Sequence, residues 1–142
     1  YNLRRSPNAG NVPQVPADMA TIVESLVTTI RAGKVAASHD VSQGGLAAAL
    51  CEMCGNVGVD VNLSEIAGDM SAEELLFSES HGRALLATDD PDAVSAQLDI
   101  PHVVIGTTGG NSVRITVRNE DIELDLDEIK NARASLTRLM ME

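Results

Sequence analysis

Apolar and polar positions along the chain follow two different spacings, and these spacings predict where helices and strands form. Helices are predicted where apolar residues recur every three or four positions; these segments are 19–30, 46–53, 72–77, 92–98 and 129–140. Strands are predicted where short apolar runs or alternating apolar residues stand between turn residues; these segments are 35–38, 57–63, 83–87, 102–105, 113–117 and 122–126. Gly33 supplies a stop for the first helix, and Asp125 with Glu128 resembles a capping arrangement for the last.

The order of these elements favours an α+β fold. Helices and strands interleave, but only the short Asn119-Glu120-Asp121 segment separates the last two strands, which predicts an antiparallel hairpin. We therefore expect a mixed sheet with helices packed on it. Residues 1–17 are rich in Pro, Asn and Gly and predict an extended lead-in, so the domain itself is expected over residues 18–142.

Composition and charge exclude two classes of partner. The chain has 142 residues, a formal net charge of −11, no Trp, one Tyr and one Phe. Binding of nucleic acid requires a basic groove and, for single strands, aromatic stacking platforms, so no nucleic-acid partner is expected. No apolar run approaches the roughly 18 residues that span a bilayer, so no membrane partner is expected either.

The chain start and the cysteines bear on the context of the protein. The chain begins with Tyr1 and has no charged-then-apolar leader, so we expect a piece of a longer protein without a secretory signal. Cys51 and Cys54 are too few for a disulfide framework, which favours a reducing compartment, the cytoplasm. This pair lies within a predicted helix without further zinc ligands, so packing as small apolar residues is favoured over a redox or zinc role.

The segment ASHDVSQGGLAAALCEM is a strand followed by a glycine turn and a helix of small residues. Ser42, Gly44 and Gly45 are candidates for binding phosphate, because glycines admit close backbone approach and helix starts attract anions. Asp40 is a candidate ligand for Mg²⁺ or a ribose hydroxyl, and His39 for acid or base chemistry. The spacing alone favours the simpler alternative, a tight turn that Asp40 and Ser42 cap, since neither a GxGxxG nor a Walker pattern is present.

The segment ELLFSESHGR places a polar run directly before a predicted strand. Glu79, Ser80 and His81 are candidates for lining a cleft, with Glu79 as a metal ligand or base and Arg83 as a phosphate ligand. The alternative is a solvated turn in which Arg83 pairs with Glu79. The spacing does not decide between the two.

The segment HDVSQGGLAAALCEM, followed by LFSESHGR, resembles the C-terminal domain of the aminoimidazole ribonucleotide synthetase superfamily. Within it, the resemblance is closest to the phosphoribosylformylglycinamidine synthase family, synthetase subunit II, whose closing helix is similar to LDLDEIKNARASLTRLM. Gln43 departs from the usual acidic residue, and His81 and Gly82 fall at variable positions. Val41-Ser42 argues against the related selenophosphate synthetase, thiamine-monophosphate kinase and hydrogenase maturation factor families.

The resemblance implies a three-layer α/β/α-like domain, the second C-terminal copy in an ATP-dependent ligase of de novo purine biosynthesis. Such a ligase converts formylglycinamide ribonucleotide and glutamine-derived ammonia to the amidine, using ATP and Mg²⁺. The implied partners are the rest of its own chain, a glutaminase subunit and a small accessory subunit.

The resemblance also bears on single residues. It aligns Asp40 with a metal-binding acid, and Glu79, Ser80 and His81 with a substrate-contacting segment. It places no catalytic residue in these 142 positions, so the piece itself is expected to be inactive. The alternatives are a structural duplicated domain without a working site, or the C-terminal domain of a hydrogenase maturation factor or thiamine-monophosphate kinase.

Overall fold

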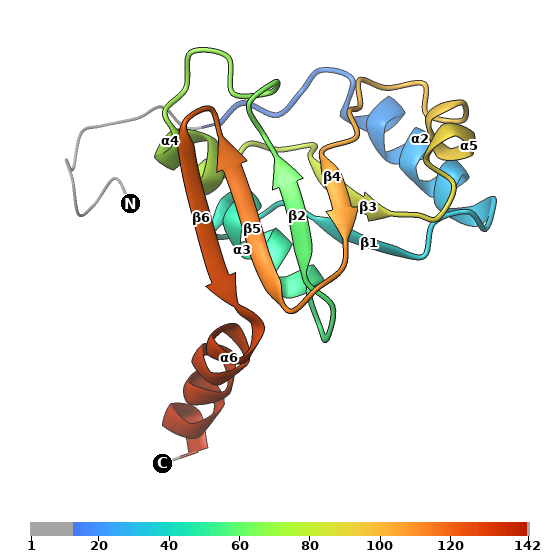
Figure 1. The fold of residues 1–142 in the computed structure, drawn as a ribbon. Helices are drawn as coiled ribbons and strands as arrows, with labels where there is room; N and C mark the ends of the chain where they lie inside the picture. The colour runs from blue at the N-terminus through green and yellow to red at the C-terminus, as the bar shows by residue number, and fades with distance from the viewer. Residues whose placement is uncertain (1–12, 142) are drawn as a thin grey trace. The chain divides into compact units, whose positions relative to one another are not determined.

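The computed structural model describes residues 13–141 (Figure 1). The described residues divide into two compact units, the first within Tyr1–Ala49 and Glu73–His102, the second within Leu50–Ala72 and Val103–Glu142. Most of the predicted lead-in lies outside the described residues, and the part from 13 to 16 has no regular structure. The expectation of one domain over residues 18–142 stays a prediction.

The first unit combines a two-stranded sheet with helices. Its elements are α2 (Met19–Arg31), β1 (Ala37–Asp40), most of α4 (Ala72–Phe77), β3 (Ala84–Ala87) and α5 (Pro91–Ser95). The helix α3 (Gly45–Met53) begins in the first unit and ends in the second. The predicted stop of the first helix is confirmed, because α2 ends two residues before Gly33, whose φ of +79° suits glycine.

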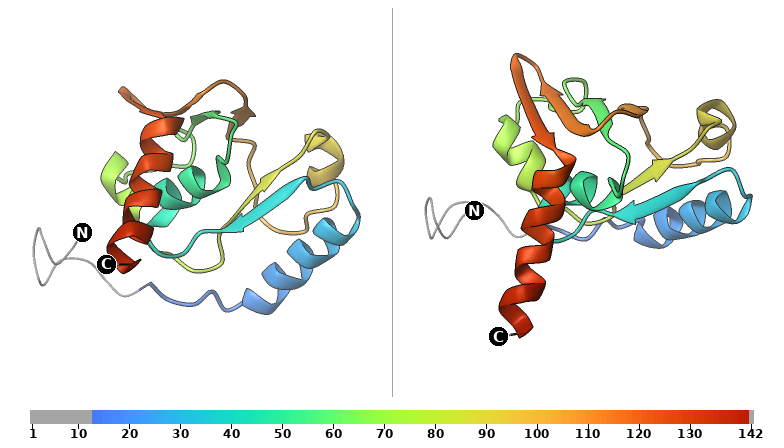
Figure 2. Two further views of the ribbon diagram at one scale, coloured as in Figure 1. Left: turned by 90° about the horizontal axis from the view of Figure 1, so that it is seen from below. Right: turned by 60° about the horizontal axis from the view of Figure 1, so that its bottom comes forward.

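Strands β1 and β3 pair in antiparallel register, from Ala37 opposite Ala87 to Asp40 opposite Ala84. The helix α2 runs alongside this pair (Figure 2). Most side chains of the two strands are exposed or half-buried. This sheet therefore has little core of its own; the first sequence motif begins within β1, and the second ends directly before β3.

The second unit contains a four-stranded sheet in the order β4-β2-β5-β6. Its elements are β2 (Val59–Asn62), β4 (Gly106–Thr108), β5 (Ser112–Val117), β6 (Glu120–Asp125) and α6 (Leu126–Met141). β2 and β5 are parallel, whereas the β2–β4 and β5–β6 pairs are antiparallel, so this sheet is mixed as predicted. The buried residues of its two central strands are Val59, Val61, Val113, Ile115 and Val117.

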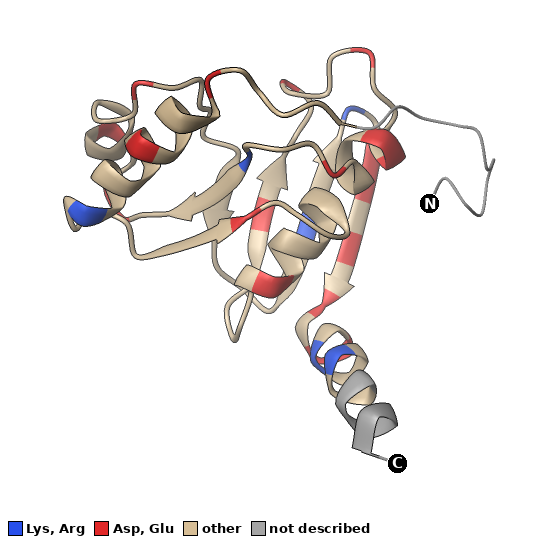
Figure 3. Cartoon of the chain, turned by 180° about the vertical axis from the view of Figure 1, so that it is seen from behind, with Lys and Arg blue, Asp and Glu red and all other residues tan. Residues whose placement is uncertain are grey.

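The predicted terminal hairpin is confirmed by β5 and β6, with Val113 opposite Leu124 and Val117 opposite Glu120. Asp125 caps the following helix, because its Oδ1 accepts a hydrogen bond of 2.7 Å from the Asp127 backbone N–H. Acidic side chains recur along the exposed face of β6 (Figure 3). This charge discourages pairing of the free edge of β6 with another strand.

The strand predicted over 102–105 is wrong, because the structure forms a strand only at Gly106–Thr108. The apolar pair Val103 and Val104 misled the prediction, since Val104 is 64% exposed. At Gly106 a Cβ would lie 2.0 Å from the Asp60 carbonyl oxygen, so only glycine permits the close approach of β4 to β2 there. The α+β class is confirmed, with strands divided between two sheets; the three-layer arrangement stays a prediction.

Candidate functional site

The turn between β1 and α3 depends on two glycines with left-handed backbone. Gly44 has a φ of +77° and Gly45 a φ of +66°, which side-chain-bearing residues rarely adopt. A Cβ on Gly45 would lie 2.5 Å from the Leu76 carbonyl oxygen and 2.7 Å from that of Ser78. The second glycine is therefore required by the close approach of the end of α4 and of Ser78, which follows it, as well as by its own conformation.

The structure brings the two sequence motifs into direct contact within the first unit. The Gly44 backbone N–H donates a hydrogen bond of 2.9 Å to Glu79 Oε1. The Val41 backbone N–H donates a bond of 3.0 Å to the Arg83 carbonyl oxygen. The glycine turn and the loop from Ser78 to Gly82, which we call the serine loop, therefore form one structural element.

Arg83 holds the serine loop from its carboxyl end. Its Nη2 donates to the Ser78 carbonyl oxygen and, over 3.3 Å, to Ser78 Oγ, while its Nε donates over 3.4 Å to the Ser80 carbonyl oxygen. The guanidinium is half-buried, and this burial lowers the pKa of Arg83 from its ordinary value. In the described part of the first unit, Glu79 thus bonds to a backbone N–H and Arg83 to two carbonyl oxygens and the Ser78 hydroxyl, and the ion pair between them considered from the sequence is not formed.

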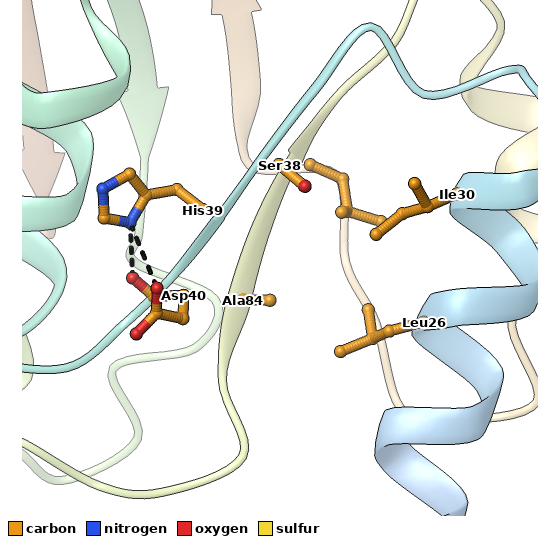
Figure 4. A pocket seen from close by; sticks show the side chains of 7 residues that line it. Leu26, Ile30, Ser38, His39, Asp40 and Ala84 are labelled. Carbon is orange, nitrogen blue, oxygen red and sulfur yellow. Dashed lines mark hydrogen bonds and ion pairs between the residues drawn. The ribbon is translucent and has the colours of Figure 1, made fainter.

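His39 and Asp40 lie at the end of β1, beside a cavity of about 310 Å³ (Figure 4). His39 Nδ1 lies 2.6 Å from the Asp40 carbonyl oxygen and 4.0 Å from Asp40 Oδ1. A carbonyl oxygen only accepts hydrogen bonds, so Nδ1 carries the hydrogen. The Asp40 side chain is 79% exposed, which leaves its carboxylate accessible to a ligand.

The cavity is lined by both apolar and polar residues. Leu26 and Ile30 project from α2 toward the strands, and Ser38, Ala84 and Leu86 complete the lining (Figure 4). The sequence motifs did not reveal the part played by α2. The signal available in the sequence was the spacing of Leu26 and Ile30, four residues apart on one face of the helix.

The remaining predicted residues lie away from this cavity. Ser42 and His81 are exposed and Ser80 is half-buried, and none of the three lines it. The Ser42 carbonyl oxygen accepts a bond of 3.1 Å from the Gly45 backbone N–H, which closes the turn. The predicted residues therefore divide between the cavity, which includes Asp40, and the contact between the glycine turn and the serine loop.

The donor groups around Asp40 fit a magnesium ion only in part. Within residues 13–141, no three His, Cys, Asp or Glu side chains gather as a metal site. Magnesium in nucleotide enzymes is held by one or two carboxylates together with phosphate oxygens and water. Asp40 offers one such carboxylate, so the other ligands must come from phosphate, water or another part of a longer protein.

The cysteine pair has ordinary thiol chemistry. Cys51 is half-buried and Cys54 is buried, and both thiols are free. Burial raises the pKa of both thiols, which lowers their reactivity near neutral pH.

Across the part of the chain that the structure describes, no helix has the length and apolar character needed to cross a membrane.

A comparison with known protein families identifies the family of this chain. The family described as AIR synthase related protein, C-terminal domain, matches residues 3–118. The chain belongs to this family. The match includes both motif segments and the strands β2, β4 and β5 of the four-stranded sheet.

Curated relatives of this chain include subunits of phosphoribosylformylglycinamidine synthase. Phosphoribosylformylglycinamidine synthase subunit PurL of Methanosarcina mazei is 45% identical over 142 residues, which are 99% of this chain and 20% of the relative. The subunit of the same name from Methanosarcina barkeri is 49% identical over 135 residues, 94% of this chain and 19% of the relative. The chain thus spans about a fifth of the length of these relatives.

Solved structures agree with the sequence comparison. T. maritima PurL complexed with FGAR superposes with a TM-score of 0.68 at 25% identity, covering 82% of this chain and 21% of that protein. T. maritima PurLQS has a TM-score of 0.67 at 23% identity, covering 82% of this chain and 22% of that one. The predicted resemblance to phosphoribosylformylglycinamidine synthases is confirmed.

Proposed function

We propose that this chain is the second C-terminal domain of an ATP-dependent carbon–nitrogen ligase of de novo purine biosynthesis. The whole ligase would convert formylglycinamide ribonucleotide, ammonia from glutamine and ATP to the amidine, ADP and phosphate. The observation that carries the proposal is the identity of 45–49% to PurL subunits over nearly the whole chain. The T. maritima relative solved with FGAR adds support for the substrate.

Within this ligase, we assign the domain to the lining of the active-site cleft. The proposed contacts to substrate or phosphate are Ser42, Ser80 and His81. Ser42 belongs to the glycine turn and the other two to the serine loop, and none of the three is a buried core residue. T. maritima PurL has also been solved with ATP and with ADP, which supports a nucleotide as the second substrate. The catalytic groups would lie in the parts of the ligase that this chain does not contain.

Asp40 is the proposed point of contact with magnesium. Its exposed carboxylate can supply one oxygen, and the remaining ligands would be phosphate oxygens and water. When bound, the ion would neutralise the charge of the phosphoryl group in transfer. His39 would hold Asp40 in place, because its Nδ1 bonds to the Asp40 backbone.

The proposed partners are the remainder of the synthetase chain, a glutaminase subunit that supplies ammonia and a small accessory subunit. The T. maritima assembly solved as PurLQS supports this composition, because its name adds two further components to PurL. We place this activity in the cytoplasm, where the free thiols of the chain would remain reduced.

A structural role is the second candidate function. It is favoured by the hydrogen bonds of Glu79 and Arg83, which are made to groups within this same domain, most of them backbone groups. In this alternative, the duplicated domain stabilises its neighbour and binds no substrate.

Replacement of Asp40 in the full-length synthetase tests the proposed function against the structural one. We expect Asp40→Ala to lower the rate of amidine formation by roughly ten- to a hundredfold with an unchanged melting temperature, because the carboxylate is exposed. Asp92→Ala, at an exposed position of α5, is the control and should keep the full rate. Unchanged kinetics for Asp40→Ala would favour the structural role.

The separate 142-residue chain provides a second test. It is expected to show no ATP hydrolysis above the buffer background, because the catalytic groups lie elsewhere. Sustained turnover by this purified chain would contradict the assignment of the catalytic groups to other parts of the ligase.

A further inference from the structure

We infer that Glu79 and Arg83 are positioning residues, which fix the serine loop against the glycine turn so that Ser80 and His81 are presented to a substrate. This inference rests on the proposed function and assigns roles that differ from those expected from the sequence. From the sequence, Glu79 is a candidate metal ligand or base, and Arg83 is a candidate phosphate ligand. The hydrogen bonds in the first unit favour a different use for each side chain.

Arg83 acts through the shape of its guanidinium. Two of its nitrogens bond to the carbonyl oxygens of Ser78 and Ser80, which lie on either side of Glu79. A guanidinium presents several donors in a rigid planar fork, whereas a lysine ammonium is a compact point charge on a flexible stem. The half-buried position of Arg83 suits this internal use better than contact with a solvated phosphate.

Glu79 acts as a hydrogen-bond acceptor for the glycine turn. Its Oε1 accepts from the Gly44 backbone N–H over 2.9 Å, across 35 positions of sequence. This bond satisfies a donor near the start of α3 that has no partner within the helix. Because the bond requires an acceptor and no negative charge, a glutamine amide oxygen can replace the carboxylate oxygen.

The two residues together hold the loop on both sides. Glu79 ties it to the glycine turn, Arg83 ties its two ends together, and the missing Cβ of Gly45 lets the backbone of 76–78 pack closely. His81 is exposed and Ser80 half-buried in the segment so fixed. Because the side chains of Ser78 and Glu79 already bond within this unit, we assign Ser80 and His81 as the ones that meet a ligand.

Conservative variants of the full-length synthetase separate positioning from charge. We expect Glu79→Gln to keep kcat and the KM for formylglycinamide ribonucleotide near wild type. We expect Glu79→Ala to raise that KM and to lower kcat/KM by up to about a hundredfold. We expect Arg83→Lys to lose nearly as much as Arg83→Met, because neither side chain supplies the fork.

The opposite pattern would overturn the inference. A Glu79→Gln variant as impaired as Glu79→Ala, with Arg83→Lys near wild type, would show that the two charges contact metal and phosphate. Full activity in all four variants would show that the loop presents nothing to a substrate. The matched controls are Glu123→Ala and Arg114→Lys, which alter an exposed ion pair of 3.0 Å in the second unit and should leave the kinetics unchanged.

Amide hydrogen exchange of the same full-length proteins tests the positioning without relying on activity. The Gly44 amide should exchange faster in Glu79→Ala than in wild type, and as slowly as wild type in Glu79→Gln. Equal exchange in all three proteins would overturn the inference. A wild-type enzyme that forms no amidine would refute the proposed function, whereas the exchange pattern would still confirm or overturn the anchoring of the loop.

Discussion

The two sheets of this chain differ in what their residues are used for. The four-stranded sheet of the second unit buries an aliphatic layer on β2 and β5, and both strands have a partner on each side. The two-stranded sheet of the first unit is mostly exposed, yet its strand β1 carries Asp40 and leads into the glycine turn. The comparison indicates that stability is concentrated in the larger sheet, whereas the candidate site depends on hydrogen bonds and glycine geometry at the smaller one.

Truncation in the core of the larger sheet should have the largest effect on stability. Ile115 is 2% exposed in the middle of β5. We expect Ile115→Ala to lower the free energy of unfolding by about 2–5 kcal/mol, measured by urea unfolding of this chain, because the lost side chain leaves a cavity. Leu85→Ala on the half-buried β3 is the comparison and should cost less. Equal losses would break the contrast between the sheets.

A methyl group in the glycine turn should have an intermediate effect. Gly45→Ala places a Cβ 2.5 Å from a backbone oxygen that no side-chain rotation can move away. We expect a loss of about 1–3 kcal/mol in the free energy of unfolding from this overlap. The matched control is Gly33→Ala, which has a similar positive φ but no atom within 4 Å of the added Cβ. The difference between the two variants measures the packing of the turn, and a difference of zero would contradict the close approach.

Acidification should have the smallest effect, and it tests an exposed contact of the first unit. The hydrogen bond from the Ala93 backbone N–H, with help from Lys34, lowers the pKa of Asp90. A depressed pKa in the folded state gives stability that is present above the ordinary value near 4 and is lost as the pH falls through the folded value. We expect the melting temperature of Asp90→Asn to fall less steeply than that of the wild type as the pH drops below about 4. Thermal melting at a series of pH values measures this.

The same reasoning applies to the larger sheet, which provides a second test of the titration. Hydrogen bonds from Ser112 and Arg114 lower the pKa of Glu123 on β6. Glu123→Gln should therefore flatten the acid profile in the same direction as Asp90→Asn. A profile unchanged in both variants would show that neither exposed contact influences acid stability.

The sequence predicted local features well, because their causes lie within a few residues. The hairpin of β5 and β6, the Gly33 stop and the Asp125 cap all follow from periodicity and turn chemistry, and the structure confirms each. A tight turn at Gly44-Gly45 was also predicted, and both glycines there have positive φ.

The contacts that join the two motifs could not be predicted from the sequence. The bond from Gly44 to Glu79 spans 35 positions, and no local pattern specifies that an acidic side chain will accept from that particular N–H. Burial was also misjudged at Val104, where an apolar residue predicted a strand but lies in solvent. Both failures have one cause, since tertiary packing decides which apolar residues are covered and which side chains face each other.

The proposed division between stability and the site can be tested by one paired measurement on the full-length synthetase. The rate of amidine formation is compared in Glu79→Ala and Ile115→Val, at a temperature where both remain folded. We predict that Glu79→Ala loses up to about a hundredfold in kcat/KM. We predict that Ile115→Val keeps the wild-type rate, although its unfolding free energy falls by about 0.5–1.5 kcal/mol. Equal rates in the two variants, or a loss confined to Ile115→Val, would contradict the division.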